Sequence, residues 1–253
     1  MNRAQLLGLM EELGLKGFVQ IFNQEGPSCE VLTHEERLYR LLCAERDQRQ
    51  SRRIARLNTM AKFKDLGASI DRVEYGAARG VDKGRLLQLS TGDYLRRAQN
   101  ILIIGPTGAG KSFLAQALGR EAVNQGHSVR YCRVLRLLEE IKVARIAGAY
   151  TKLITSLSRY RLLILDDFAV TALDEDSVTD LFEVIEERSL KGSTIVTAQL
   201  PIEEWHGVLG NATLADAILD RLVHNAHKIE LKGESMRKKQ GLGGEHLDTS
   251  GTI

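Results

Sequence analysis

The sequence of 253 residues has few cysteines, few aromatic residues and no long apolar run. Its three cysteines, Cys29, Cys43 and Cys132, are odd in number and widely spaced, so they match neither a disulfide framework nor a zinc site. Such usage indicates a reducing compartment. Aromatic residues make up 5% of the chain, and we therefore expect an aliphatic core, which suits helices packed on parallel strands.

No stretch approaches the roughly 20 apolar residues that a membrane-spanning helix needs. The first residues, MNRAQLLGLMEELG, carry charges within their apolar stretch and lack a small-residue cleavage site. We therefore expect no membrane segment and a cytoplasmic location.

The net charge of +2 is unevenly distributed. Residues 1–99 carry 17 Lys and Arg against 13 Asp and Glu, whereas the remainder carries 18 against 20. Four arginines are spaced to share one face of a predicted helix: Arg49, Arg52, Arg53 and Arg56. They form either a solvated helix face or a surface that contacts the phosphates of duplex DNA, which would make binding depend on salt.

The amino-terminal part of the sequence contains residues that are typical of helix starts, and we therefore expect helices there. Asn2 is suited to cap a first helix, and Thr33 with Glu36 forms a capping box ahead of a longer one. We expect a small all-helical domain over residues 1–66 that binds DNA or a partner protein. Residues 65–99 lack strong periodicity and are interpreted as a connector.

From Asn100 onward, short β-rich runs alternate with helical stretches. The runs are ILII, SVRYCRV, RLLILD, STIVTA and HKIEL. This alternation predicts an α/β fold, a parallel sheet flanked by helices on both faces. We expect this larger domain to span residues 67–240, and residues 241–253 to form a disordered tail because they contain too few apolar residues to pack.

The segment GPTGAGKS matches the pattern G-x-x-x-x-G-K-[ST] between an apolar strand and a helix, the context that this phosphate-binding motif requires. Its glycines let backbone amides surround one anion, and the helix adds its positive end. We expect Lys111 to contact the β and γ phosphates and the Ser112 hydroxyl to bind magnesium. The predicted ATP-binding residues of this loop are Gly105, Pro106, Thr107, Gly108, Ala109, Gly110, Lys111 and Ser112.

Polar residues follow the next two predicted strands. Asp166 ends RLLILD and is the predicted magnesium-side carboxylate, and Asp167 is the candidate that orients or polarises the attacking water. A pair of aspartates can also start a helix. Gln199, at the end of STIVTAQLP, could reach the γ phosphate or the water, with Thr197 as the alternative.

Together, GPTGAGKS, LLILDDF, TIVTAQLP and GESMRKK, with the leucine- and arginine-rich amino end, resemble the AAA+ ATPase superfamily. Within its DnaA/DnaC-like branch of replication initiators and helicase loaders, the chain is most similar to the IstB family of insertion-sequence helper ATPases. The resemblance covers nearly the whole chain apart from its tail. It implies an oligomeric, ATP- and magnesium-dependent ATPase that binds duplex DNA, selects or prepares the target and activates a partner transposase.

The resemblance also implies roles for two arginines. Arg221, in ILDRLVHN, matches the arginine that completes the catalytic site of a neighbouring subunit, and Arg237, in GESMRKK, is similar to one that senses nucleotide. Asp167 departs from the superfamily, in which many members carry the longer Glu. This departure implies slow hydrolysis, or hydrolysis that needs assembly.

Three other functions stay open at this point. A helicase loader would use the same site but dock its amino-terminal domain on a replicative helicase. A small-molecule kinase would share the phosphate loop, although no segment indicates an acceptor pocket or a lid. A non-enzymatic DNA-binding switch would bind ATP and hardly hydrolyse it.

Overall fold

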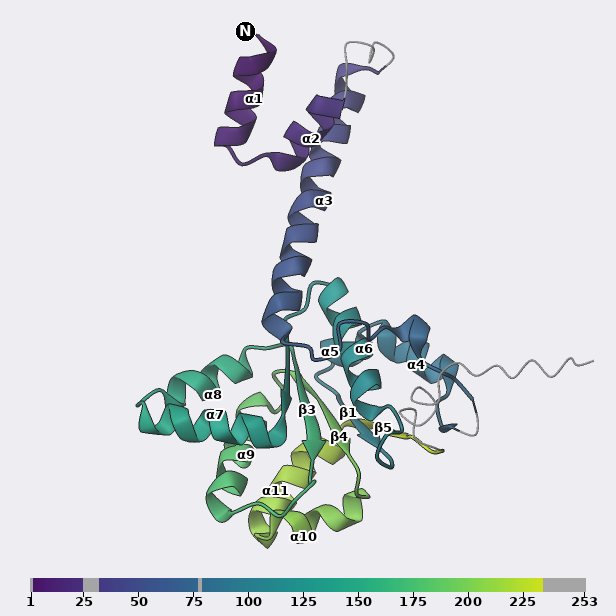
Figure 1. Ribbon diagram of the computed structural model, residues 1–253, viewed down its shortest axis with the longest axis vertical. Coiled ribbons are helices and arrows are strands. Elements are labelled where there is room, and N and C mark those ends of the chain that lie inside the picture. The colour runs from purple at the N-terminus through teal and green to yellow at the C-terminus, as the bar shows by residue number, and fades with distance from the viewer. Residues whose placement is uncertain (1, 25–31, 77–78, 234–253) are drawn as a thin grey trace, which may run out of the picture. The chain divides into compact units, whose positions relative to one another are not determined.

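A computed structural model describes residues 2–24, 32–76 and 79–233 (Figure 1). The chain divides into two compact units, and the boundary between them lies between Leu57 and Asn58. The helices are α1 Arg3–Glu12, α2 Lys16–Gln24, α3 His34–Ala61, α4 Lys83–Ser90, α5 Asp93–Arg96, α6 Lys111–Asn124, α7 Val134–Ile146, α8 Tyr150–Ser158, α9 Glu175–Arg188, α10 Trp205–Leu209 and α11 Ala212–Val223, with 3-10 turns η1 Ile70–Arg72 and η3 Ile202–Glu204. The strands are β1 Asn100–Ile104, β2 Val129–Arg133, β3 Leu162–Phe168, β4 Ser193–Ala198 and β5 Ala226–Glu230.

Both predicted helix starts in the first unit are confirmed. The Asn2 side chain accepts from the Gln5 amide while the Gln5 side chain accepts from the Asn2 amide, which closes a capping box on α1. Thr33 and Glu36 make the same reciprocal pair ahead of α3. The intervening α2 was not predicted.

Helices α2 and α3 pack closely at a glycine. A Cβ atom added to Gly17 would lie 2.5 Å from the backbone of Glu45. The Gly17 amide donates to the buried Glu45 carboxylate over 2.7 Å, and the Arg49 guanidinium binds its other oxygen over 2.7 Å. Burial alone would raise the pKa of Glu45, but these two donors stabilise the charged form, so the pKa lies below its usual value.

The second unit is built on a five-stranded, all-parallel sheet of order β2-β3-β4-β1-β5 (Figure 1). All five strands coincide with the predicted β-rich runs. Strand β4 is buried throughout, and β1 and β3 almost so. Strands buried on both faces read as continuous apolar runs, as ILII of β1 and LLIL of β3 do.

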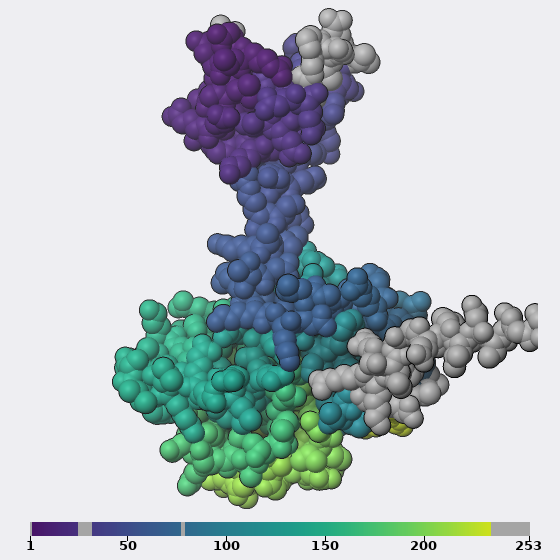
Figure 2. Space-filling view, viewed as in Figure 1, coloured from purple at the N-terminus to yellow at the C-terminus, as the bar shows by residue number. Residues whose placement is uncertain are grey.

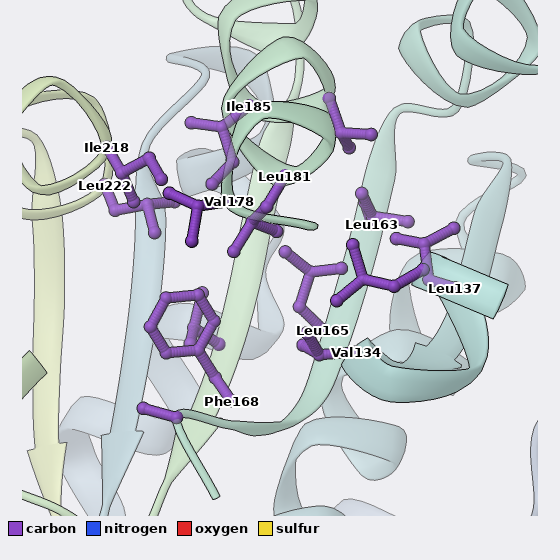
Figure 3. Close-up of a cluster of buried hydrophobic side chains, with 14 of the residues drawn as sticks. Val134, Leu137, Leu163, Leu165, Phe168, Val178, Leu181, Ile185, Ile218 and Leu222 are labelled. Atoms are coloured by element: carbon purple, nitrogen blue, oxygen red, sulfur yellow. The ribbon is translucent and has the colours of Figure 1, made fainter. Parts of the chain in front are cut away.

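Helices cover both faces of this sheet, as predicted. Leu163 and Leu165 of β3 point into a buried cluster with side chains from α7, α9 and α11 (Figure 3). Ile164 points to the opposite face because side chains alternate along a strand. There it meets α6, where a Cβ atom added to Gly119 would lie 2.7 Å from the Ile164 side chain.

Residues 65–99 are more structured than a connector. They form η1, α4 and α5, and Leu86, Leu89, Tyr94 and Leu95 are buried. The predicted domain limits, 1–66 and 67–240, stay predictions, and the predicted tail of residues 241–253 lies outside the described residues.

A buried glutamine joins α6 to the chain that follows α3. The Gln116 side-chain oxygen accepts from the amides of Lys64 and Asp65 over 2.7 and 2.8 Å. Its side-chain nitrogen donates to the carbonyl of Ser112 over 3.1 Å. One side chain thus links the first turn of α6 to the residues just beyond Ala61.

The surface of the second unit includes α7 and α8, shown in teal in Figure 2. At the end of α7, Val143 and Ile146 are largely exposed. Among the residues that the structure describes, no helix is both long and apolar enough to cross a membrane.

Candidate functional site

The chain turns sharply between β1 and α6, and glycines permit this turn. Gly105, Gly108 and Gly110 have φ of +155°, +83° and +92°, a region that favours glycine. A Cβ atom on Gly105 would lie 2.4 Å from the Leu231 carbonyl oxygen. Within the loop, Pro106 and Thr107 are exposed whereas Ala109 is buried.

Positive charge converges on this loop. The Lys111 side chain is 7% exposed, and its Nζ donates to the carbonyl oxygens of Gly105 and Pro106 over 2.7 and 2.9 Å. Gly110 caps α6 without a side-chain hydrogen bond, so the first amides of this 14-residue helix receive no side-chain acceptor from their N-cap. An ammonium group and a helix amino end directed at one loop are suited to an anion such as a phosphate.

Asp166 lies at the carboxyl end of β3, 1% exposed, and three hydroxyl groups donate to it. Its Oδ1 accepts from Ser112 Oγ over 2.8 Å and from Thr197 Oγ1 over 2.5 Å. Its Oδ2 accepts from the Tyr131 hydroxyl over 2.6 Å. The structure therefore brings together two residues predicted for magnesium, Ser112 and Asp166, from separate elements.

The hydroxyl and carboxylate oxygens of Ser112 and Asp166 are the hard ligands that Mg²⁺ prefers. They lie 2.8 Å apart beside the phosphate loop. This donor set fits a magnesium ion held by one or two protein oxygens, which is how nucleotide enzymes usually hold it.

Asp167 leaves the regular strand. Its φ is +58°, and the pairing of β3 with β4 shifts register between Leu165 and Phe168. The Asp167 amide donates to Thr197 Oγ1 over 3.1 Å, and its carboxylate lies 3.4 Å from Arg133 Nε. Asp tolerates this left-handed backbone better than most residues, and its half-exposed side chain faces Arg133.

The two candidates at the end of β4, Thr197 within the strand and Gln199 just after it, have different positions. Gln199 is exposed and accepts from the Thr107 hydroxyl over 2.8 Å, so it contacts the phosphate loop. Thr197 is fully buried and contacts Asp166 and the Asp167 amide instead. Both therefore lie at the site, Gln199 on its exposed side.

Three features of the site were not predicted: the Tyr131 hydroxyl, the Arg79 side chain and a cavity. Arg79 donates to the carbonyl oxygen of Ala109 over 3.1 Å and pairs with Glu74 over 2.9 Å, so it supports the loop from the side. A cavity of about 310 Å³ adjoins the first turn of α6. Its apolar lining residues are Val81, Leu86, Leu114 and Ile229, with polar residues around them.

Arg221 lies away from the phosphate loop of its own chain. Its carbonyl oxygen accepts from the Asn100 side chain at the amino end of β1, whereas the loop follows the carboxyl end of the same strand. The Arg221 guanidinium pairs with Glu186 of α9, which raises its pKa, and donates to the Ala217 carbonyl over 2.9 Å. Arg237 lies outside the described residues.

The four arginines of α3 that were predicted to bind DNA, Arg49, Arg52, Arg53 and Arg56, are all exposed. Arg49 is nonetheless engaged, because its Nε binds the buried Glu45 carboxylate. Of this group, Arg49 therefore also serves the packing of α2 on α3.

Residues 8–243 match the model of the IstB-like ATP binding protein family. The chain belongs to this family. It is 42% identical to the insertion sequence ATP-binding protein y4pL of Sinorhizobium fredii, over 92% of this chain and 96% of that protein. It is 36% identical to the insertion sequence IS1162 ATP-binding protein of Pseudomonas fluorescens, over 82% of this chain and 90% of that protein.

Solved structures of the same fold are more distant. DnaA from Aquifex aeolicus with bound AMPPCP gives a TM-score of 0.59 at 18% identity, covering 71% of this chain and about half, 54%, of the DnaA chain. The DnaC helicase loader gives 0.54 at 17% identity, covering 66% of this chain and 98% of that one. These findings confirm the predicted family, the AAA+ fold and an ATP-binding AAA+ ATPase.

Proposed function

We propose that this IstB-like ATPase is a transposition helper: it binds Mg²⁺ and ATP, assembles with further copies on duplex DNA, and assists a transposase in target selection. The observation that carries the nucleotide part is the contact of Ser112 with the buried Asp166 beside a lysine-bearing glycine loop. The names of the relatives, which are insertion sequence ATP-binding proteins, support the transposition part.

Each residue of the candidate nucleotide site has a separate role in this proposal. The loop amides and Lys111 bind the phosphates, and Ser112 and Asp166 hold the magnesium, which neutralises charge on the transferred phosphoryl group. In this proposal, Asp167 and Gln199 orient the attacking water or contact the γ phosphate. The cavity lined by Val81 and Leu114 would receive the base, because it adjoins the turn of α6 that faces the phosphates.

Arg221 acts on a neighbouring copy in this proposal. Its position at the amino edge of the sheet puts it at the opposite end of β1 from its own phosphate loop. An arginine supplied across an interface stabilises the transition-state charge and raises turnover by about 10³ to 10⁵. Hydrolysis then requires assembly, which suits the short Asp167 side chain.

Duplex DNA is bound by the exposed arginines of α3. Arg52, Arg53 and Arg56 present guanidinium groups at helical spacing on one face. The logarithm of the DNA-binding constant falls linearly with the logarithm of the salt concentration. Each phosphate that these arginines neutralise contributes about −0.9 to the slope of that line.

A helicase loader is the second candidate. The similarity to the DnaC helicase loader favours it only through the shared fold. The loader function predicts copurification with a replicative helicase, whereas the helper function predicts copurification with a transposase.

The decisive experiment measures mass in solution with and without ATP, Mg²⁺ and duplex DNA. We expect the wild-type chain to form assemblies only when ATP is present, and the mass of these assemblies to increase when duplex DNA is added. Arg221→Ala should keep ATP binding and lose turnover by at least about 10³, while Arg96→Ala, which removes an exposed arginine paired to Asp93, should behave as wild type. ATP-independent DNA binding by a monomer would contradict the proposal.

A salt titration tests the DNA surface. The variant Arg52→Gln/Arg53→Gln/Arg56→Gln should flatten the salt slope by up to about 2.7. Arg49 stays unchanged in it because Glu45 needs its charge. An unaltered slope would assign DNA contact to another surface.

A further inference from the structure

The carboxylate of Asp166 is held at both oxygens, and the donor to Oδ2 lies outside every motif. Ser112 and Thr197 donate to Oδ1, and the hydroxyl of Tyr131 donates to Oδ2 over 2.6 Å. Tyr131 is 6% exposed and Asp166 is 1% exposed, so this hydrogen bond is shielded from water.

The sheet explains how Tyr131 reaches this carboxylate. Strands β2 and β3 pair in parallel, with Tyr131 opposite Ile164 and Arg133 opposite Asp166. Paired residues and residues two positions apart share a face, so Tyr131 and Asp166 are diagonal neighbours on one face. Diagonal neighbours on adjacent strands are within reach of an aromatic side chain.

Two hydrogen-bonded oxygens define the plane of a carboxylate. The terminal torsion of an aspartate has broad minima, so a donor at one oxygen alone leaves the plane poorly fixed. A buried acceptor without a donor is also costly. Tyr131 satisfies Oδ2 and thereby keeps Oδ1 directed at Ser112, the residue expected to bind magnesium.

We infer that Tyr131 is a positioning residue for the magnesium site: its hydroxyl orients the Asp166 carboxylate toward Ser112, so that removal of this hydroxyl weakens the magnesium-dependent part of nucleotide binding. This inference rests on the proposed Mg²⁺ and ATP site and adds a residue from β2 to it. A tyrosine that merely filled the core would leave the magnesium dependence unchanged.

The test compares two phenylalanine variants of the full chain. Tyr131→Phe removes the hydroxyl bonded to Asp166, and Tyr94→Phe removes a buried hydroxyl that has no hydrogen-bond partner among the described residues. Binding of a non-hydrolysable ATP analogue is measured by calorimetry with Mg²⁺ and with EDTA, after circular dichroism has compared the folds.

We expect Tyr131→Phe to bind about five- to tenfold more weakly than wild type with Mg²⁺, and within about twofold of it in EDTA. Tyr94→Phe should match wild type in both conditions. A Tyr131→Phe chain with the full wild-type gain from Mg²⁺, or one that has lost its fold, would overturn the positioning role. If wild type itself gained nothing from Mg²⁺, the proposed magnesium site would fail and the inference with it.

A double-mutant cycle with Asp166→Asn gives a second readout. Once the carboxylate is gone, Tyr131→Phe should change the Mg²⁺-dependent gain by less than about twofold, because its hydroxyl no longer has a charged acceptor to orient. Equal effects in both backgrounds would show that the hydroxyl acts independently of Asp166 and would contradict the inference.

Discussion

Arg221 and Glu186 form an ion pair within one chain, between the end of α11 and α9. If Arg221 acts in the catalytic site of a neighbouring copy, its ion pair with Glu186 must break or change its geometry when the two subunits associate. A partly exposed ion pair contributes only about 0–1 kcal/mol. We therefore predict that Glu186→Gln raises ATP turnover about two- to fivefold at limiting protein concentration. Turnover as low as that of Arg221→Ala would instead show that Glu186 positions the arginine.

Lys111→Met should remove most nucleotide affinity. The variant keeps the volume of the side chain but loses an ammonium group that now binds Gly105 and Pro106 and would bind phosphate oxygens. Hydrogen bonds to charged groups contribute about 1.5–3 kcal/mol each, so an affinity loss of about 10- to 100-fold or more is expected in calorimetry. Undiminished affinity would remove the loop from the proposed site.

Asp167→Asn should separate binding from hydrolysis. Asparagine tolerates the left-handed backbone at this position, so the bulge is retained while the charge facing Arg133 is lost. Nucleotide affinity should stay within about threefold, and turnover by the assembled protein should fall about 10²- to 10⁴-fold. The control Asp176→Asn changes an exposed aspartate in α9. Equal turnover in both variants would exclude Asp167 as the group that activates water.

Gly105→Ala should destabilise the second unit. The new methyl group would meet the Leu231 carbonyl oxygen at 2.4 Å with φ at +155°, and backbone strain of this kind costs about 1–3 kcal/mol. Gly207→Ala is the matched control, since nothing lies within 4 Å of its added Cβ in α10. Urea unfolding followed by circular dichroism measures both. A Gly105→Ala midpoint equal to that of the control would contradict the close approach of Leu231.

Acid should loosen α2 from α3 through Glu45. The folded pKa of this carboxyl lies below its ordinary value of 4.5. Its contribution to stability is therefore complete above pH 4.5 and is lost as the pH falls through the folded pKa. Hydrogen exchange of α2 peptides, corrected for intrinsic rates, should rise below pH 4.5 in wild type. In Glu45→Gln, the α2 peptides should exchange faster than in wild type at neutral pH, with little further change as the pH falls. If the exchange rates of wild type and Glu45→Gln had the same pH dependence, Glu45 would not be the group that holds α2 on α3.

The sequence predicted those parts of the fold and site that depend on local pattern. The phosphate loop is contiguous, and the strands that contain Asp166 or precede Gln199 are apolar runs followed by polar residues. Such runs identify a strand and the edge at which it ends without any knowledge of its neighbours.

The contributions of Tyr131 and Arg79 could not be predicted in this way. Tyr131 contacts Asp166 only because β2 lies beside β3 in the sheet. The sequence of a single strand does not indicate which strand lies next to it. Arg79 precedes short helices whose stability comes from burial of Leu86 and Leu89 and not from local periodicity. The left-handed backbone of Asp167 likewise results from the register shift between two strands.

Gln116 has a consequence for communication along the chain. It holds the amides of Lys64 and Asp65 while its own nitrogen binds the carbonyl of Ser112. If a bound nucleotide moved the turn that carries Ser112, Gln116 would transmit that movement to the residues directly after α3, the helix with the predicted DNA-binding arginines. Because such coupling is reciprocal, a polyanion that fixes that helix would raise affinity for the nucleotide by the same factor by which the nucleotide favours the polyanion.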